Sequence, residues 1–231
     1  MLTGRRERAV RLEPSHPAQA MKRAQDHYAR RAKQDGFAAR SAYKLEEIDR
    51  RKGLLKAGQR VLDLGCAPGS WLQYAAARVG ENGMVIGIDV QPVAVALPPQ
   101  ARALEGDVFG PVTDMLPHGG RGFDVILSDM APKTTGVPSG DAARSAALAR
   151  RALELARALL RPGGVLLVKV FQGGEYPALR QEFRACFQRV TVEKPKASRS
   201  ESVEVFLLGT GFQPAASSQA ARRDGEAGAG K

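Results

Sequence analysis

Four aspartates in this chain stand where a nucleoside ligand would be bound. They come at or near the ends of predicted strands: Asp63, Asp89, Asp107 and Asp129. Parallel strands bring their carboxyl ends to one crevice, where α/β proteins bind nucleotides. Asp89 follows Gly69 by 20 residues, a distance typical of an acid that binds ribose hydroxyls. We expect Asp107 to accept an adenine amino group and Asp63 to hold the adjoining glycine turn through backbone N–H groups. Any one of these acids also suits a turn or helix cap, but four favour a ligand site.

The glycine turn lies in the segment DLGCAPGSW, residues 63–71. Gly65 and Gly69 allow a tight turn and a close approach of the backbone to a ligand. The G-x-x-x-G spacing differs from the dinucleotide motif G-x-G-x-x-G, and no lysine follows it to bind a phosphate. The turn therefore favours a nucleoside without a pyrophosphate, and S-adenosylmethionine is the leading candidate. Trp71 suits contact with that ligand and packing in the core equally well.

A lysine interrupts the apolar segment VLLVKVF at residues 165–171. Burying the ammonium group of Lys169 inside a strand is costly unless it is paired. One interpretation is that its side chain leaves the sheet at the strand end. The other is a catalytic lysine whose proton affinity is tuned by burial and by neighbouring charges.

The charge of the chain predicts a polyanionic partner. The 231 residues carry a net charge of +11, with a pI near 10.1. Residues 1–60 hold 16 Lys or Arg and 7 Asp or Glu, a net of +9. A charge that only aided solubility has no reason to gather at one end. Nucleic acid is therefore the first candidate.

The cysteines and the apolar runs point to a reduced compartment. Cys66 and Cys186 cannot form a disulfide framework, and with three isolated histidines they make no metal site. No run of about 18 apolar residues predicts a membrane helix, and the N-terminus lacks a secretory apolar region. We therefore expect a cytoplasmic protein without a metal or a membrane. The arginine-rich N-terminus leaves a mitochondrial transit segment open, although two glutamates count against it.

Strand and helix patterns alternate through the middle of the chain, which predicts an α/β fold with a mostly parallel sheet. Prolines at 92, 98 and 99 predict an irregular connection in place of a second helix. The last two strands suit an antiparallel pair. We expect a basic, mobile extension over 1–20, one folded domain over 21–211 and a disordered tail over 212–231. Strands are predicted at 60–64, 84–88, 102–105, 123–127, 165–171, 189–193 and 203–209, and helices at 38–51, 69–79, 139–160 and 176–187.

Five segments resemble the FtsJ-like (RrmJ-type) ribosomal RNA 2′-O-methyltransferases, from about residue 28 to residue 211. They are RSAYKL at 40–45, DLGCAPGSW at 63–71, SDMAP at 128–132, VKVFQG at 168–173 and EVF at 204–206. The resemblance implies a class I S-adenosylmethionine-dependent methyltransferase: a Rossmann-like, seven-stranded sheet with an antiparallel C-terminal strand and helices on both faces. It also implies a catalytic tetrad at Lys44, Asp129, Lys169 and Glu204. Cofactor contacts are implied at Gly69, Trp71, Asp89, Asp107 and Asp129. One departure is Lys133, where the family often has asparagine.

The reaction implied is methylation of a ribose 2′-hydroxyl, with S-adenosylhomocysteine as the second product. The hydroxyl is a weak acid and needs a base or electrostatic help. Lys169 accepts a proton only when its amine is neutral. The positive charge of Lys44 would favour this neutral form, and the charges of the two carboxylates would oppose it. The alternative that Lys169 orients the hydroxyl and stabilises the developing negative charge stays open. Basic side chains would bind RNA phosphates, with strong salt dependence; we assign this role to Arg30, Arg31, Lys33, Arg40, Lys194, Lys196 and Arg199.

The resemblance implies a uridine of large-subunit ribosomal RNA as substrate, methylated in the assembled subunit or a late precursor by a monomeric enzyme. The same chemistry on a tRNA ribose or an mRNA cap is the nearest alternative. A non-catalytic RNA-binding assembly factor is another class, against which the complete tetrad argues. A nicotinamide dehydrogenase is disfavoured because G-x-G-x-x-G is missing. The sequence leaves the target nucleotide, the need for an assembled subunit and the oligomeric state open.

Overall fold

The computed structural model describes residues 28, 30–198 and 202–214. The predicted extension over 1–20 and nearly all of the predicted tail lie outside these residues. The predicted domain over 21–211 lies mostly inside them, and its last strand ends at Phe212.

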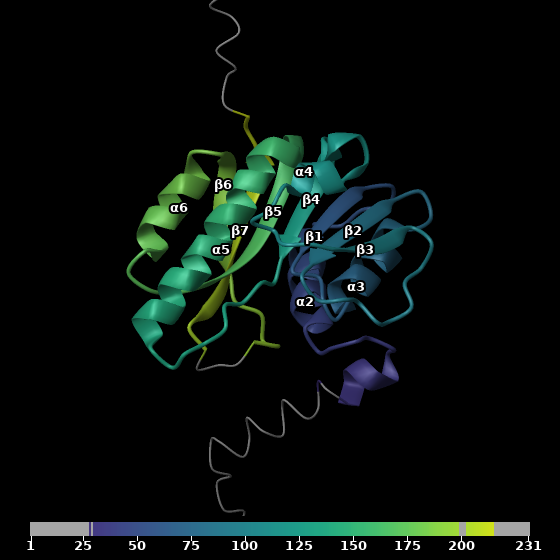
Figure 1. Cartoon of the computed structure of the whole chain (residues 1–231), viewed down its shortest axis with the longest axis horizontal. Coiled ribbons are helices and arrows are strands. Elements are labelled where there is room, and N and C mark those ends of the chain that lie inside the picture. Colours follow the sequence, from purple (N-terminus) through teal and green to yellow (C-terminus); the bar gives the residue numbers. More distant parts are fainter. Residues whose placement is uncertain (1–27, 29, 199–201, 215–231) are drawn as a thin grey trace, which may run out of the picture.

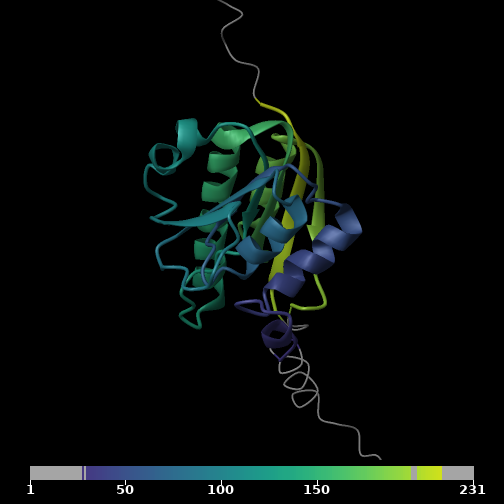
Figure 2. The same cartoon turned by 90° about the vertical axis from the view of Figure 1, so that its right-hand side faces the viewer.

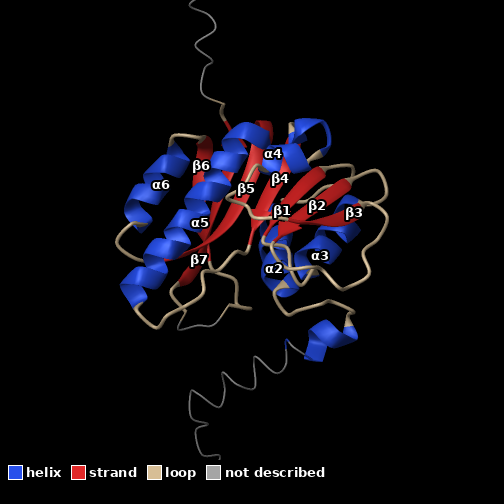
Figure 3. Cartoon of the chain, in the orientation of Figure 1, coloured by secondary structure: helices blue, strands red, loops and turns tan. Residues whose placement is uncertain are grey.

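Seven strands form one sheet in the order β3-β2-β1-β4-β5-β7-β6 (Figures 1 and 3). The first five strands run parallel, and β7 is antiparallel to both β5 and β6. This confirms the predicted fold class, including the antiparallel C-terminal strand. The strands are β1 (Arg60–Leu64), β2 (Met84–Asp89), β3 (Ala101–Glu105), β4 (Phe123–Ser128), β5 (Leu160–Phe171), β6 (Phe187–Glu193) and β7 (Glu204–Phe212).

Helices cover both faces of the sheet, so the central strands are buried on both sides and consist of nearly continuous apolar runs. In β1, Leu62 packs in the core under α5 and α6, whereas Val61 packs in the core under α2 and α3. Figure 2 shows α5 and α2 on opposite sides of the sheet. The helices are α2 (Ala42–Lys52), α3 (Ser70–Val79), α4 (Val112–Met115), α5 (Pro138–Leu159) and α6 (Tyr176–Arg184), with a 3-10 turn at Pro117–Gly120.

Several boundaries differ from the predicted ones, and the largest differences lie around the Pro-Gly-Gly segment and helix α6. The long helix α5 ends at Leu159, but β5 begins at once at Leu160 instead of after the Pro-Gly-Gly segment. The pairing register with β4 shifts between Phe123 and Val125, and Gly163 has a φ of 79°, so an irregularity absorbs this segment within the strand. Helix α6 ends at Arg184, three residues before β6 begins. The short α4 and the 3-10 turn were not predicted, because four residues carry no periodic signal.

The connection from β2 to β3 contains no helix, as its prolines predicted. Among the residues that the structure describes, no helix combines the length and the apolar composition needed to cross a membrane.

Candidate active site

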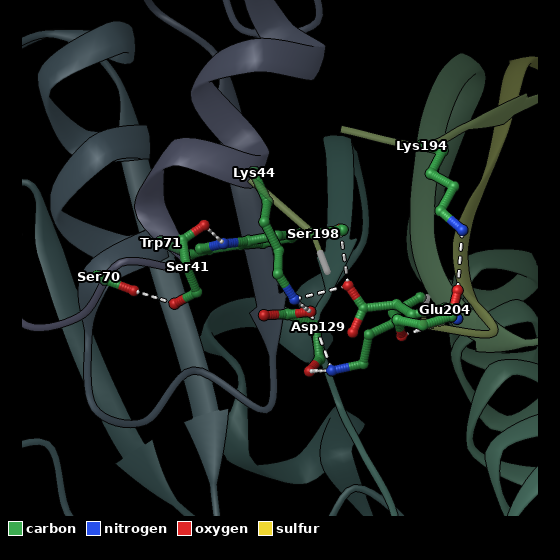
Figure 4. A network of polar contacts seen from close by, with 10 residues as sticks. Ser41, Lys44, Ser70, Trp71, Asp129, Lys194, Ser198 and Glu204 are labelled. Atoms are coloured by element: carbon green, nitrogen blue, oxygen red, sulfur yellow. Dashed lines mark hydrogen bonds and ion pairs between the residues drawn. The ribbon is translucent and has the colours of Figure 1, made fainter. Parts of the chain in front are cut away.

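Two lysines and two carboxylates meet at one edge of the sheet (Figure 4). The Lys44 Nζ lies 2.7 Å from Glu204 Oε1 and 3.6 Å from Asp129 Oδ1. The Lys169 Nζ lies 3.0 Å from the same Asp129 oxygen. Asp129 therefore bridges the two lysines, and Glu204 pairs with the first of them. The structure brings together all four residues of the predicted tetrad, although they span 160 positions of the chain.

The sheet topology explains why three of these residues are neighbours. Asp129 directly follows β4, and Lys169 lies near the carboxyl end of β5, the next strand in the sheet. Strand β7 runs the opposite way, so its first residue, Glu204, pairs with Phe171 at the last position of β5. The antiparallel final strand thus returns a carboxylate to the edge where the parallel strands end.

Helix α2 supplies Lys44 from one face of the sheet, and the residue before this helix anchors it. The Trp71 Nε1 donates to the Ser41 carbonyl at 2.8 Å, and the hydroxyls of Ser41 and Ser70 are 2.7 Å apart. Both partners lie in the first turn of α3, which begins directly after the glycine turn. The predicted cofactor half of the site and the lysine helix are therefore fastened together.

Lys169 is buried and paired. Its side chain is 6% exposed, and its Nζ also donates to the Asp129 backbone carbonyl at 2.5 Å. The lysine therefore points into the cluster instead of leaving the sheet for solvent. The geometry excludes the first interpretation of the interrupted apolar strand, and the pairing with Asp129 compensates the buried charge. The catalytic role of Lys169 stays a prediction.

The charges in the cluster favour an ionised Glu204. Burial raises the pKa of this carboxyl, but the charge and hydrogen bond of Lys44, the charge of Lys169 and the hydrogen bond of Ser198 outweigh it. Its pKa therefore lies below the usual range. The two lysines and the two acids alternate in the cluster, so each side chain lies beside one of opposite formal charge.

The glycine turn is held by Asp89, not by Asp63 as predicted. The Ala67 N–H donates to Asp89 Oδ2 at 3.0 Å, and the Gly65 N–H donates to the Ile88 carbonyl at 2.8 Å. Gly65 has a φ of 77°, and a Cβ atom on it would lie 2.4 Å from the Met130 Cγ. Asp63 misses the turn because it lies one residue inside β1, where its carboxyl stays in the core.

Neither carboxyl oxygen of the buried Asp63 has a hydrogen-bond partner among the described residues. Burial raises the pKa of this carboxyl well above its usual range, and the nearby charges of Asp129 and Asp89 raise it further. An uncompensated acid under the turn is the environment that a positively charged ligand group would stabilise. Asp107 differs, because it is exposed and accepts the Phe109 N–H in a turn after β3.

The four acids lie along adjacent strands, since β3, β2, β1 and β4 are consecutive in the sheet. Trp71, in the first turn of α3, is packed in the core. Its indole is 2% exposed and stacks on Phe206, with ring centroids 5.9 Å apart. The structure thus favours the packing interpretation of this residue, and its contact with a cofactor stays a prediction.

The residues predicted to bind RNA differ in their surroundings. Arg31 lies over the Tyr43 ring, 4.6 Å from its centroid, and pairs with Asp35 at 3.3 Å. Arg40 is half-buried. Arg199 lies outside the described residues. The side chains of the others are exposed: Arg30, Lys33, Lys194 and Lys196.

Sequence reasoning missed two polar groups that position the cluster. The Ser198 hydroxyl donates to Glu204 Oε1 at 2.9 Å. Asp49, on α2, accepts the Leu55 N–H at 2.8 Å and the Tyr74 hydroxyl at 2.9 Å. No local pattern marks either residue, since a serine in a polar loop and an acid on an amphipathic helix are ordinary. Among the described residues, no three His, Cys, Asp or Glu side chains meet as metal ligands do.

Comparison with known proteins identifies the family. The family model described as FtsJ-like methyltransferase matches residues 37–212. The chain belongs to this family. A curated relative from Syntrophobacter fumaroxidans, named Ribosomal RNA large subunit methyltransferase E, is 48% identical over 187 residues, 80% of this chain and 94% of the relative. A protein of the same name from Desulfatibacillum aliphaticivorans is 46% identical over 184 residues, 80% of this chain and 89% of the relative.

Two solved structures share the fold. A ribosomal RNA methyltransferase from Plasmodium falciparum is 27% identical, with a TM-score of 0.67 over 78% of this chain and 100% of that one. Fibrillarin from Aeropyrum pernix, crystallised with S-adenosyl-L-methionine, is 20% identical, with a TM-score of 0.53 over 74% of this chain and 76% of that one. The second likeness shows a common fold only. The family assignment confirms the resemblance inferred from the five sequence segments.

Proposed function

We propose that this FtsJ-like methyltransferase transfers a methyl group from S-adenosylmethionine to the 2′-hydroxyl of a uridine ribose in large-subunit ribosomal RNA. The observation that carries the proposal is the continuous cluster of Lys44, Glu204, Asp129 and Lys169 at the carboxyl edge of the sheet. Two curated relatives of this chain, 46% and 48% identical to it, are named as methyltransferases of large-subunit ribosomal RNA.

The residues beside the cluster fit the methyl donor. The glycine turn at Gly65–Gly69 lets a ligand approach the backbone closely, and the uncompensated carboxyl of Asp63 suits a cationic ligand group. Asp89 and Asp107, on the two neighbouring strands, are assigned to the ribose and the adenine. When bound, S-adenosylmethionine supplies an activated methyl group on a sulfonium and leaves as S-adenosylhomocysteine. The protein must then orient the hydroxyl and remove one proton.

We assign that proton to the amine of Lys169. A ribose hydroxyl is a weak acid, so a positioned base strengthens it as a nucleophile. Lys169 must first lose its own proton. The Asp129 Oδ1 lies 3.0 Å from this amine and 3.6 Å from the Lys44 amine. Asp129 and Glu204 also fix both amines in place, so the two lysines keep one geometry as RNA enters.

The substrate proposed is ribosomal RNA in the large subunit or a late precursor. A cytoplasmic location and a monomeric enzyme are part of the same proposal. The charge of +9 on residues 1–60 suits binding to RNA phosphates. Methyl transfer itself needs no metal ion in this scheme.

The test is a tritium-transfer assay with purified protein, using large subunits, free large-subunit RNA and tRNA from a strain that lacks the gene. We expect label in the large-subunit RNA, at one ribose 2′-position in methylation maps. Label in tRNA alone would refute the ribosomal assignment. A Lys169→Ala variant should transfer no methyl group but bind S-adenosylmethionine with nearly unchanged affinity by isothermal titration. Full activity in that variant would remove Lys169 from the mechanism.

A further inference from the structure

The loop between β6 and β7 reaches into the tetrad through one side chain. Ser198 is 8% exposed, and its Oγ donates to Glu204 Oε1 at 2.9 Å. That same oxygen accepts the Lys44 Nζ at 2.7 Å. Figure 4 shows Ser198 beside Glu204, with the two contacts converging on one carboxylate oxygen. Ser198, which is not a member of the tetrad, thus binds the same carboxylate oxygen as Lys44.

The loop that carries Ser198 is seated on the helix that carries Lys44. The Lys196 backbone N–H donates to Glu47 Oε2 at 2.7 Å. Glu47 and Lys44 are three residues apart on α2 and therefore lie on one side of the helix. The Ser198 N–H closes a turn on the Pro195 carbonyl at 3.0 Å, and the Lys194 Nζ donates to the Ser202 carbonyl at 2.8 Å. These contacts fix the position of the Ser198 hydroxyl relative to Lys44.

We propose that Ser198 is a positioning residue, which holds the Glu204 carboxylate in the orientation that receives Lys44 and so keeps the tetrad assembled for methyl transfer. This inference rests on the proposed function. A carboxylate held only by a lysine has freedom to rotate and to bind the ammonium with its other oxygen. A second, neutral donor on the same oxygen removes that freedom, and a hydrogen bond to a charged acceptor is stronger than one between neutral groups.

The position of the loop gives this contact a consequence for RNA. Of the two lysines predicted to bind phosphates, Lys194 directly precedes the turn that presents Ser198, and Lys196 lies within it. A polyanion bound by these two lysines would lie on the same loop that supplies Ser198 to Glu204. Two hydrogen bonds, from Ser198 to Glu204 and from Lys44 to Glu204, thereby connect the predicted RNA-binding loop to Lys44.

Titration of Glu204 provides a test that does not depend on activity. The charged groups that face it are Lys44 on α2, Lys169 on β5 and Asp129 after β4, and Ser198 is the neutral donor. The serine hydrogen bond stabilises the ionised carboxylate, so its removal must raise the pKa of Glu204. In Ser198→Ala we therefore expect the Glu204 carboxyl to take up its proton at a higher pH than in the wild-type protein.

The experiment compares Ser198→Ala with Ser198→Thr, which keeps the hydroxyl, and with Ser202→Ala as a matched control. Ser202 lies in the same loop, but its hydroxyl accepts the Glu204 backbone N–H at 3.1 Å and leaves the carboxylate alone. We expect Ser198→Ala to lower kcat about tenfold with little change in KM for the RNA, as for loss of one hydrogen bond to a charged group. Ser198→Thr should recover most of that loss, and Ser202→Ala should behave as wild type.

Carbon-13 NMR titration of the Glu204 carboxyl, in protein without RNA, provides the independent readout. A raised pKa in Ser198→Ala and an unchanged one in Ser202→Ala would support the proposal. An unchanged pKa in Ser198→Ala, or an equal rise in both variants, would overturn it. If the wild-type protein fails to methylate ribosomal RNA, the proposed function fails, while the titration still shows whether Ser198 positions Glu204.

Discussion

Asp49→Ala should destabilise the protein by an amount that follows from three contacts. Asp49 is 1% exposed and lies on α2, five residues after Lys44. Its carboxylate accepts the Leu55 N–H at 2.8 Å, the Tyr74 hydroxyl at 2.9 Å and the Arg78 Nε at 3.0 Å. These bonds fasten the end of the lysine helix to α3 and to the chain that leads into β1. Alanine would leave the donors without their acceptor.

The three donors contribute unequally. The Leu55 N–H is buried, and a buried donor without a partner costs about 1–3 kcal/mol. The Tyr74 hydroxyl is also buried and costs a similar amount, whereas the half-exposed Arg78 can turn to water and adds less. We therefore expect Asp49→Ala to lower the free energy of unfolding by about 3 kcal/mol. Asp49→Asn keeps one oxygen acceptor and should cost about half as much.

Urea unfolding followed by tryptophan fluorescence measures this change. The chain has one tryptophan, Trp71, which bonds to the residue that precedes α2 and therefore reports on that helix. Asp114→Ala, which removes an exposed carboxylate, is the control and should change the free energy by less than about 0.5 kcal/mol. A loss below about 1 kcal/mol in Asp49→Ala would refute the reasoning, because it would mean that the buried donors find other partners.

Three further outcomes are expected. Lys169→Arg should lose methyl transfer as fully as Lys169→Ala, since a guanidinium stays protonated and cannot act as a base; an active arginine variant in the tritium assay would instead support charge stabilisation. The raised pKa of Asp63 means that the folded state binds its proton more tightly than the unfolded chain, so stability falls as pH rises above about 4. Asp63→Asn should flatten this dependence in urea titrations between pH 4 and 7 and weaken S-adenosylmethionine binding; an unchanged slope would contradict the assignment. Lys196→Ala should reduce the slope of log affinity for RNA against log salt by about 0.7–0.9, and an unchanged slope would remove Lys196 from the RNA contacts.

Much of the fold could be predicted, because its signals are local. The strand at Arg60–Leu64 has the predicted bounds, and α3 begins one residue after the predicted start. Continuous apolar runs mark strands buried on both faces, and glycines mark the turns between them. The errors occur where pairing overrides local pattern. By its local pattern, the Pro-Gly-Gly segment predicts a loop between a helix and a strand. In the structure, Leu160 pairs with Phe123 of β4, so the strand begins before this segment.

The same contrast between local signals and long-range contacts applies to the residues of the site. The acids at successive strand ends could be found because parallel strands carry their ligands at one edge. The role of Asp63 was wrong, because the direction of one carboxyl inside a strand depends on its neighbours: its two flanking strands present Gly87 and Leu127 at that position. Ser198 could not be found, because its partner is decided by how the β6–β7 loop sits on α2.

By itself, the sequence determined the α/β class, the glycine turn and, through five short motifs, the methyltransferase family. Those properties depend on residues close together in the chain, whose conformations and periodicity are local. Only the tertiary structure decided that Lys44 and Glu204 share one contact, that Asp89 holds the turn and that Ser198 joins the cluster. The physical reason is that these contacts join segments up to 160 residues apart, and they form only where the antiparallel β7 and the anchored α2 place them.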